Sequence, residues 1–307
     1  MNFKEKFKEG IITAKEFTRE DIEFILSKAR QILERRGKFE DLRGKILATL
    51  FFEPSTRTRL SFESAMLRLG GNVIGVHSGD VSSIKKGESI ADTIRTVENY
   101  SDCIVMRHSL EGAATLAAKF AKIPIINAGS GSGEHPTQAL LDLLTITEEG
   151  QNLDGMNIGI MGDLKYGRTV HSLAILLSNY ETNIYFISPK DLMLRNRDKD
   201  LLRQRQVKFK EITQYRNILE ILDVLYMTRI QKERFADIEE YDRVKGFYVF
   251  AKEDLAVTKD TFKLMHPLPR VNEISPEIDE SPKAIYFKQT AYGIPMRMAI
   301  LKELLVD

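Results

Sequence analysis

The feature that most constrains the fold is a regular alternation between short apolar runs rich in β-branched residues and longer stretches with helical periodicity. Consecutive parallel strands need a crossover connection, usually a helix, so the alternation predicts an α/β protein in which helices flank central parallel sheets. The expected strands are 46–52, 73–76, 104–106, 125–126, 158–161, 184–187, 207–209, 224–227 and 262–266. The expected helices include 18–36, 56–69, 136–147 and 295–305.

The length of 307 residues indicates about two domains. The last expected helix has no later strand to serve, so we expect it to pack back on the first domain. The sequence therefore predicts a first domain at 1–136, with the C-terminal segment 293–307 packed on it, and a second domain at 137–292. Two interdomain helices would join them.

Composition excludes several classes of protein. The 45 basic residues nearly balance the 44 acidic ones, so there is no global attraction to nucleic acid or to an anionic membrane. Any strong anion site must come from local clustering. Cys103 is the only cysteine, which rules out an intrachain disulfide and a cysteine zinc site. No acidic cluster is spaced to bind a metal, so we expect neither a metal nor a cofactor.

The N-terminal segment is rich in lysine and glutamate and lacks the apolar stretch of a signal peptide. No run approaches the ~18 apolar residues that a transmembrane helix requires. A cytoplasmic location is the expectation.

The segment Phe51-Phe52-Glu53-Pro54-Ser55-Thr56-Arg57-Thr58-Arg59 lies where an expected strand leads into an expected helix. Free N–H groups and the dipole at a helix N-terminus suit a phosphate. Hydroxyl groups and the Arg57 guanidinium add donors. Each residue taken singly is more simply a helix cap or part of a solvated face, but together they predict an anion site. No G-x-x-x-x-G-K pattern is present, so ATP is not implied.

Further polar residues follow other strands. Arg107 ends an expected strand at the carboxyl edge of the sheet, the usual ligand side of an open α/β sheet. His135 and Gln138 begin a helix after a glycine-rich loop. In the second half, Arg168 and Arg229 each come just after a strand, and a pair of guanidinium groups suits a dicarboxylate. Taken alone, each could equally be structural or a surface ion pair.

The S-T-R-T-R segment after F-x-E-P resembles the carbamoyl phosphate signature of the aspartate and ornithine carbamoyltransferases. Other motifs agree in order, from Phe51 to the Tyr292-Gly293-Ile294-Pro295 run. The resemblance implies that the carbamoyl phosphate contacts are Ser55, Thr56, Arg57, Thr58, Arg107, His135, Gln138, Leu268 and Pro269. It implies that the amino acid contacts are Ser82, Lys86, Arg168, Arg229 and Gln231.

Two features favour the aspartate branch. The segment His266-Pro267-Leu268-Pro269-Arg270 is similar to the aspartate enzymes, whereas ornithine enzymes resemble H-C-L-P, and the carbonyls of Pro267 and Leu268 can accept hydrogen bonds from the substrates. Ornithine would also need an acidic partner, where these loops offer Arg229 and Lys86. The implied reaction gives N-carbamoyl-L-aspartate and phosphate, the committed step of de novo pyrimidine biosynthesis. Ornithine carbamoyltransferase is the alternative.

The resemblance also implies an assembly. In this family the loop that corresponds to 82–86 reaches the active site of a neighbouring subunit, with a serine and a lysine four apart, as Ser82 and Lys86 are. A homotrimer with shared sites follows from it. Whether a separate regulatory chain joins trimers into a dodecamer is left open by the sequence.

The implied catalytic residues are Arg57, Thr58, Lys86, Arg107 and His135. No residue is an evident general base, so the departing phosphate is expected to take the proton of the amine. One departure from the family pattern stands next to this set. The family usually has S-N-Q-H-P where this chain has Ser132-Gly133-Glu134-His135-Pro136, which places a carboxylate near the anion site and leaves its effect open.

Two other classes of protein remain as weaker interpretations. A nicotinamide dehydrogenase is suggested by the segment 158–163, but Met161 stands where the second glycine of G-x-G-x-x-G belongs. An inactive scaffold related to the carbamoyltransferases would lack an active-site residue, and none of the expected ones is missing.

Overall fold

The computed structural model describes residues 2–35, 38–76, 87–235 and 237–306. The chain forms two compact units, which we call unit 1 (Met1–Leu144 with Ala291–Asp307) and unit 2 (Thr145–Thr290). Both passages of the chain between the units lie inside helices, α6 (Pro136–Glu148) and α10 (Tyr286–Leu305).

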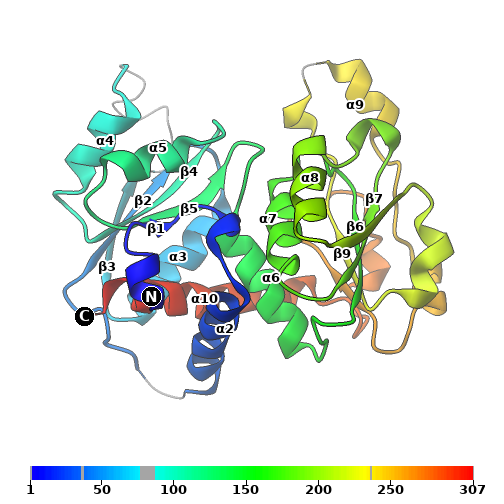
Figure 1. The fold of residues 1–307 in the computed structure, drawn as a ribbon, viewed down its shortest axis with the longest axis horizontal. Coiled ribbons are helices and arrows are strands. Elements are labelled where there is room, and N and C mark those ends of the chain that lie inside the picture. The colour runs from blue at the N-terminus through cyan, green and yellow to red at the C-terminus, as the bar shows by residue number, and fades with distance from the viewer. Residues whose placement is uncertain (1, 36–37, 77–86, 236, 307) are drawn as a thin grey trace. The chain divides into compact units, whose positions relative to one another are not determined.

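Unit 1 contains a five-stranded parallel sheet in the order β1-β5-β4-β2-β3 (Figure 1). Its strands are β1 (Gly10–Ile11), β2 (Ile46–Phe51), β3 (Asn72–Val76), β4 (Cys103–His108) and β5 (Ile125–Ser130). Its helices, besides its parts of α6 and α10, are α1 (Phe3–Lys6), α2 (Arg19–Glu34), α3 (Thr56–Arg68), α4 (Ile90–Val97) and α5 (Ala113–Phe120). Helices α4 and α5 pack on one face of the sheet through an apolar cluster, and α3 lies on the other face.

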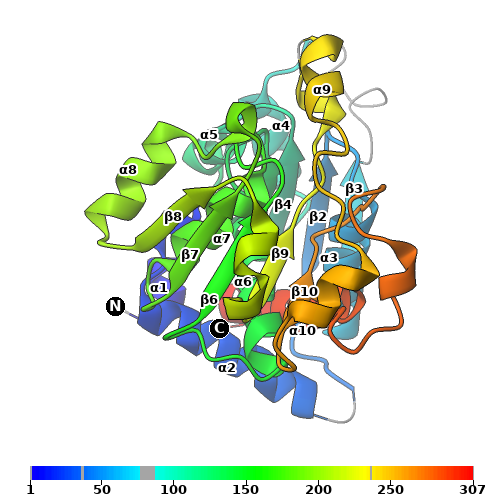
Figure 2. The same cartoon turned by 90° about the vertical axis from the view of Figure 1, so that its right-hand side faces the viewer.

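Unit 2 repeats this architecture with a parallel sheet in the order β10-β9-β6-β7-β8 (Figure 2). Its strands are β6 (Asn157–Met161), β7 (Asn183–Ile187), β8 (Lys208–Ile212), β9 (Val224–Met227) and β10 (Lys263–Met265). Its longer helices are α7 (Arg168–Leu177), α8 (Asn196–Gln204) and α9 (Ile238–Val244). An aromatic and aliphatic core fills one side of this sheet, with Phe250 and Phe262 stacked at 6.2 Å between ring centroids.

The expectation of α/β architecture with two parallel sheets is confirmed, but two details differ. The last helix begins at Tyr286 rather than at Pro295, which lies inside it. Proline suits a first helical turn, yet buried residues such as Tyr286 and Gln289 anchor two earlier turns. The expected boundary at 136/137 falls at the start of α6, whereas the units divide at 144/145, because the first turns of α6 are buried within unit 1.

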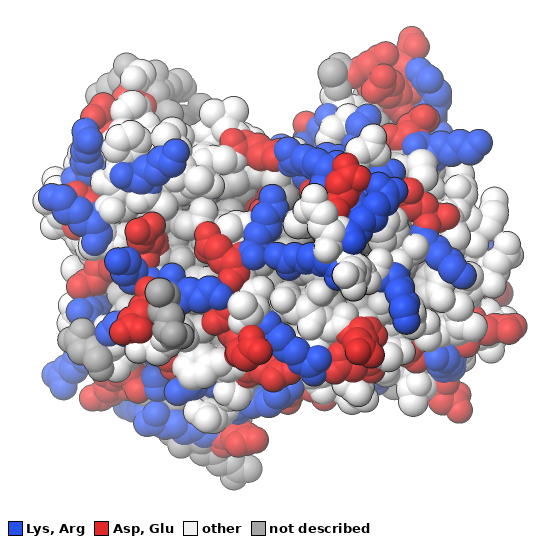
Figure 3. Space-filling model, in the orientation of Figure 1, with Lys and Arg blue, Asp and Glu red and all other residues white. Residues whose placement is uncertain are grey.

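Figure 3 shows acidic and basic side chains interspersed over the face it displays, in keeping with the balanced composition. Across the residues described, no helix combines the length and the apolar character needed to cross a bilayer.

Candidate active site

The ends of β2 and β4 in unit 1 bring two of the expected anion-binding segments together. Phe51 pairs with Arg107 across the two strands, and the Phe52 N–H donates to the Arg107 carbonyl at 2.9 Å. Because all strands are parallel, their carboxyl ends meet at one edge of the sheet. The loop that leads into α3 and the Arg107 side chain therefore belong to the same edge.

Helix α3 begins at this edge with the expected donors in its first turn. Ser55 is the N-cap residue in an extended conformation (φ −160°, ψ 94°), and its side chain makes no capping hydrogen bond. The Ser55 hydroxyl therefore does not cap the helix. Thr56 and Arg57 are exposed, whereas Thr58 is buried. The N-terminus offers backbone N–H groups, a guanidinium and hydroxyl groups in one turn, which is the chemistry of a phosphate site.

Arg107 is held in place by groups on both neighbouring segments. Its Nη1 donates to the Ala128 carbonyl at 3.4 Å, and its Nε lies 3.6 Å from a carboxylate oxygen of Glu53. Glu53 belongs to the F-E-P part of the segment before α3, so its carboxylate holds the Arg107 guanidinium next to that segment. This contact gives a structural reason for the glutamate in that motif.

The third part of this edge follows β5. His135 and Gln138 are both buried, and the Thr137 hydroxyl lies 3.5 Å from Nδ1 of His135. The Gln138 side chain donates through Nε2 to Oδ1 of Asp142 at 2.9 Å. The structure thus places the loop before α3, Arg107, His135 and Gln138 on the ends of adjacent strands β2, β4 and β5.

In unit 2 the corresponding edge is formed by β6, β9 and β10, which are neighbours in the sheet. The Thr228 N–H donates to the Met161 carbonyl at 2.7 Å, which joins the loops that follow β6 and β9. Gly162 has φ +122°, and a Cβ there would lie 2.2 Å from the Thr228 carbonyl oxygen. Only glycine allows the two loops to approach this closely.

The two expected aspartate ligands follow these strands. Arg168 is the first residue of α7 and is buried, and Arg229 follows β9 by two residues. Arg229 forms a two-pronged ion pair with Glu233, with 3.0 Å between Nη1 and Oε2. A substrate carboxylate would have to share or replace that contact. Gln231 is half-buried in the same loop.

Asp163 ties these two loops together from a buried position. Its Oδ1 accepts the Tyr166 N–H at 2.9 Å, and the Gln231 backbone N–H also points to the carboxyl. Burial raises the pKa of Asp163 to about 6, against the lowering effect of the N–H groups of Tyr166, Gln231 and Lys165.

This raised pKa makes stability depend on pH. Between pH 3.8, the ordinary pKa of aspartate, and about pH 6, Asp163 is protonated in the folded chain but ionised in the unfolded chain. Its contribution to the free energy of unfolding is therefore complete below pH 3.8 and is lost as the pH rises to about 6. The loss amounts to about 3 kcal/mol. Asp163→Asn does not titrate. Urea unfolding of both proteins from pH 4 to 7 should show the wild type losing that amount of stability relative to Asp163→Asn. A difference that stays constant with pH would contradict it.

The turn after β10 is held by a buried histidine. The Leu268 N–H donates to Nδ1 of His266 at 2.8 Å, and Nε2 of His266 lies 2.8 Å from Oε1 of Glu273. The other oxygen of Glu273 accepts the N–H groups of Val271 and Asn272 at 3.0 and 3.1 Å. Leu268 has φ +56°, an uncommon conformation for a residue with a side chain. The hydrogen bonds around it hold this backbone in place.

Comparison with known proteins finds a family match in each of the two units. Residues 10–148 match the carbamoyl phosphate binding domain of the aspartate/ornithine carbamoyltransferases, and residues 154–304 match their aspartate/ornithine binding domain. The chain belongs to this family. No group of three or more His, Cys, Asp or Glu side chains among the described residues is placed to hold a metal ion.

Several similar proteins are aspartate carbamoyltransferases. The aspartate carbamoyltransferase catalytic subunit of Thermococcus kodakarensis is 57% identical over 95% of both chains. That of Methanothrix thermoacetophila is 52% identical over 97% of this chain and 98% of its own. The solved catalytic subunit of M. jannaschii aspartate transcarbamoylase is 51% identical, with a TM-score of 0.88 over 97% of this chain and 98% of its own. Aspartate transcarbamoylase from Trypanosoma cruzi, in complex with N-(phosphonacetyl)-L-aspartic acid, is 39% identical, with a TM-score of 0.91 over 99% and 98%.

The departure from the carbamoyltransferase pattern at Glu134 has a structural explanation. Its carboxylate accepts hydrogen bonds from the Thr13 hydroxyl at 2.7 and 2.8 Å and from the Ala14 N–H at 2.6 Å. Lys15 lies within 4.0 Å of it. The glutamate therefore fastens the loop before His135 to the segment after β1.

Two predicted site residues cannot be placed, and three supporting residues were not predicted from the sequence. Ser82 and Lys86 lie outside the described residues, so their placement stays a prediction. The supporting side chains Asp142, Asp163 and His266 were not recognised as part of the site from the sequence. A carboxylate four residues after Gln138 was a usable signal, because residues i and i+4 share a helix face.

Proposed function

We propose that this chain is an aspartate carbamoyltransferase, which transfers the carbamoyl group of carbamoyl phosphate to the amine of L-aspartate. The observation that carries the proposal is the pair of guanidinium groups, Arg168 and Arg229, after neighbouring strands of unit 2. Two bidentate cations match a dicarboxylate amino acid. Ornithine would present an ammonium group to the same cations. The names of the relatives support the same substrate.

Unit 1 binds carbamoyl phosphate in this proposal. The phosphate lies at the N-terminus of α3 against Ser55, Thr56 and Arg57, where N–H groups and the helix dipole favour an anion. Thr58, Arg107 and His135 donate to the carbonyl oxygen of the carbamoyl group, on which negative charge grows during attack. Each donor of this type is typically worth about 10²–10³ in rate.

Unit 2 binds aspartate, with Arg168, Arg229 and Gln231 as the contacts. The carbonyls of the 267–268 turn accept from substrate N–H groups. The neutral amine attacks the carbamoyl carbon, the new C–N bond forms, and the bond between the carbamoyl carbon and the phosphate oxygen breaks. The phosphate dianion takes the amine proton as it leaves. The products are N-carbamoyl-L-aspartate and phosphate, so the chain serves pyrimidine biosynthesis in the cytoplasm.

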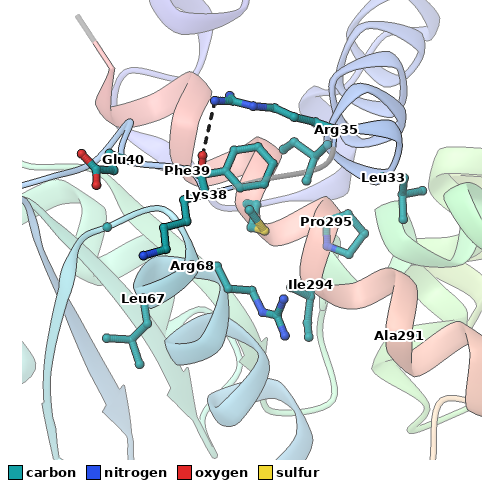
Figure 4. A pocket seen from close by; sticks show the side chains of 13 residues that line it. Leu33, Arg35, Lys38, Phe39, Glu40, Leu67, Arg68, Ala291, Ile294 and Pro295 are labelled. Atoms are coloured by element: carbon teal, nitrogen blue, oxygen red, sulfur yellow. Dashed lines mark hydrogen bonds between the residues drawn. The ribbon is translucent and has the colours of Figure 1, made fainter.

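A homotrimer with shared sites is part of the proposal, with Ser82 and Lys86 given to a neighbouring subunit. Apolar surface on unit 1 supports self-association, since Leu60 and Leu67 on α3 are 50% and 60% exposed. A cavity of about 680 Å³ opens beside Leu67 at the C-terminal end of α3 (Figure 4). It lies at the opposite end of the helix from the phosphate site, so it is not the substrate pocket. A regulatory chain that gives a dodecamer is compatible with this arrangement.

Two experiments test the proposal. Purified protein is assayed with carbamoyl phosphate and either L-aspartate or L-ornithine, and we expect carbamoyl transfer to aspartate; transfer to ornithine instead would overturn the assignment. Arg57→Ala and Lys86→Ala chains, each inactive alone, are then mixed and allowed to exchange subunits. Recovered activity is expected if one site uses Arg57 of one chain and Lys86 of another. No recovery after demonstrated exchange would contradict sharing.

A further inference from the structure

Gln138 is oriented by a buried carboxylate one helical turn further along α6. Its side-chain Nε2 donates to Oδ1 of Asp142 at 2.9 Å, and Asp142 is fully buried. The two residues are four apart, which places them on one face of the helix. The contact is therefore built into the helix and does not depend on a loop.

The chemistry of this contact fixes which end of the amide faces outward. An ionised carboxylate only accepts hydrogen bonds, whereas an amide has a donor end and an acceptor end. Gln138 must therefore turn its NH₂ group toward Asp142 and its Oε1 away. Within the described part of the chain, Oε1 accepts no hydrogen bond. An acceptor is thus held ready at the start of α6.

A second buried charge stabilises the carboxylate. Arg297 on α10 is buried, and attraction to Asp142 opposes the effect of burial, which lowers the pKa of Arg297 to about 10. Arg297 also donates to the Ser61 hydroxyl at 2.6 Å and stacks over the Phe62 ring at 4.9 Å. Gly293 makes room for it, because a Cβ there would lie 2.4 Å from Nη1. Unit 1 thus carries a dedicated counter-charge for Asp142.

We propose that Asp142 is a positioning residue that turns the Gln138 carbonyl toward the substrate and thereby selects a carbamoyl group over other acyl phosphates. A carbamoyl group carries an NH₂ that can donate to Oε1, whereas the methyl group of acetyl phosphate cannot. The inference rests on the proposed function, since it assumes that Gln138 contacts the carbamoyl group. It concerns the donor substrate only and says nothing about the choice of amino acid.

The test compares carbamoyl phosphate with acetyl phosphate in the wild type and in Asp142→Asn, at saturating aspartate. An asparagine at 142 can either accept from the Gln138 NH₂ group or donate to the Gln138 Oε1, so the amide is free to reverse. We expect kcat/KM for carbamoyl phosphate to fall roughly 10- to 100-fold, the loss of one buried hydrogen bond. The inhibition constant of acetyl phosphate should change by less than about 3-fold. A parallel loss for both compounds, or no loss for either, would overturn the inference.

Coupling to Gln138 provides a readout that a general packing defect would not move. Gln138→Ala should cause the same selective loss, and the double variant with Asp142→Asn should lose little more than either single variant. If the fold-losses in kcat/KM of the two single variants multiply in the double variant, the two residues act independently and the positioning role is refuted. Ser61→Ala is the matched control, because it removes another contact of Arg297 without touching Gln138. In Ser61→Ala, the preference for carbamoyl phosphate over acetyl phosphate should equal that of the wild type.

Asp142→Asn leaves Arg297 without its buried counter-charge and could fail to fold. The double variant Asp142→Asn with Arg297→Gln removes both charges. We expect it to show the same selective loss for carbamoyl phosphate relative to acetyl phosphate. If the wild type does not carbamoylate aspartate, the proposed function fails. The affinities for carbamoyl phosphate and acetyl phosphate, measured by calorimetry without aspartate, still decide the role of Asp142.

Discussion

Arg57→Ala is expected to lower kcat for carbamoyl transfer by about 10²–10³-fold, the typical value of one preorganised donor to a charge that develops in the transition state. Arg57 lies in the first turn of α3, where it is exposed and the helix N-terminus already favours an anion. Its guanidinium adds a cation that can contact the phosphate as it departs. Steady-state kinetics with aspartate held at saturation measure the effect.

Arg59→Ala is the matched control for this change. Arg59 lies two residues further along the same helix, and its Nε is 3.7 Å from Glu63. We expect kcat to change by less than about 3-fold, because a partly exposed ion pair contributes little. Equal losses in the two variants would mean that the helix tolerates no change here, and the specific role of Arg57 would then be wrong.

The central strands were predictable because they are buried on both faces. Such strands read as continuous apolar runs, and 46–52 or 224–227 can be recognised without their neighbours. Strand β1 could not be recognised, since it has only two residues and exists through its pairing with β5. The start of α10 was missed for a similar reason. Packing of Tyr286 in unit 2 overrides the local signal of Pro295.

The candidate site was predictable where chemistry and position coincide. Arg107 lies near the end of β4 and Arg229 just after β9, and strand ends of a parallel sheet are where ligands bind. The residues that hold these groups were less visible. Nothing in the sequence links His266 to Glu273 seven residues later, because the turn between them has no regular periodicity. Only the folded backbone shows that one side chain organises the turn.

His266→Phe is expected to lower both stability and activity, because it removes the two hydrogen bonds of the ring. Glu273 would lose the hydrogen bond from the histidine ring, and a hydrogen bond to a charged group typically contributes about 1.5–3 kcal/mol. The Leu268 N–H would lose its acceptor, and the strained Leu268 backbone would relax. Since the carbonyl of Leu268 is a proposed substrate contact, a shift of about 1 Å is expected to reduce kcat/KM by about 10²-fold.

Val271→Ala is the matched control in the same turn. Its side chain is 75% exposed, while its N–H donates to Glu273 through the backbone and is kept in the variant. Urea unfolding and steady-state kinetics should show stability within about 0.5 kcal/mol of the wild type and unchanged rates. A His266→Phe chain with wild-type kinetics would show that the turn holds its shape without the histidine.

The pH dependence separates this role of His266 from simple packing. Burial lowers the pKa of His266 by more than the hydrogen bond to Glu273 raises it, so the folded chain favours the neutral ring. The stabilising contribution is therefore complete above the ordinary histidine pKa and is lost as pH falls through the lowered value. Protonation would put a hydrogen on Nδ1 against the Leu268 N–H and break the turn. Wild-type stability should fall on acidification with a step that His266→Phe lacks, and identical pH profiles for the two chains would refute it.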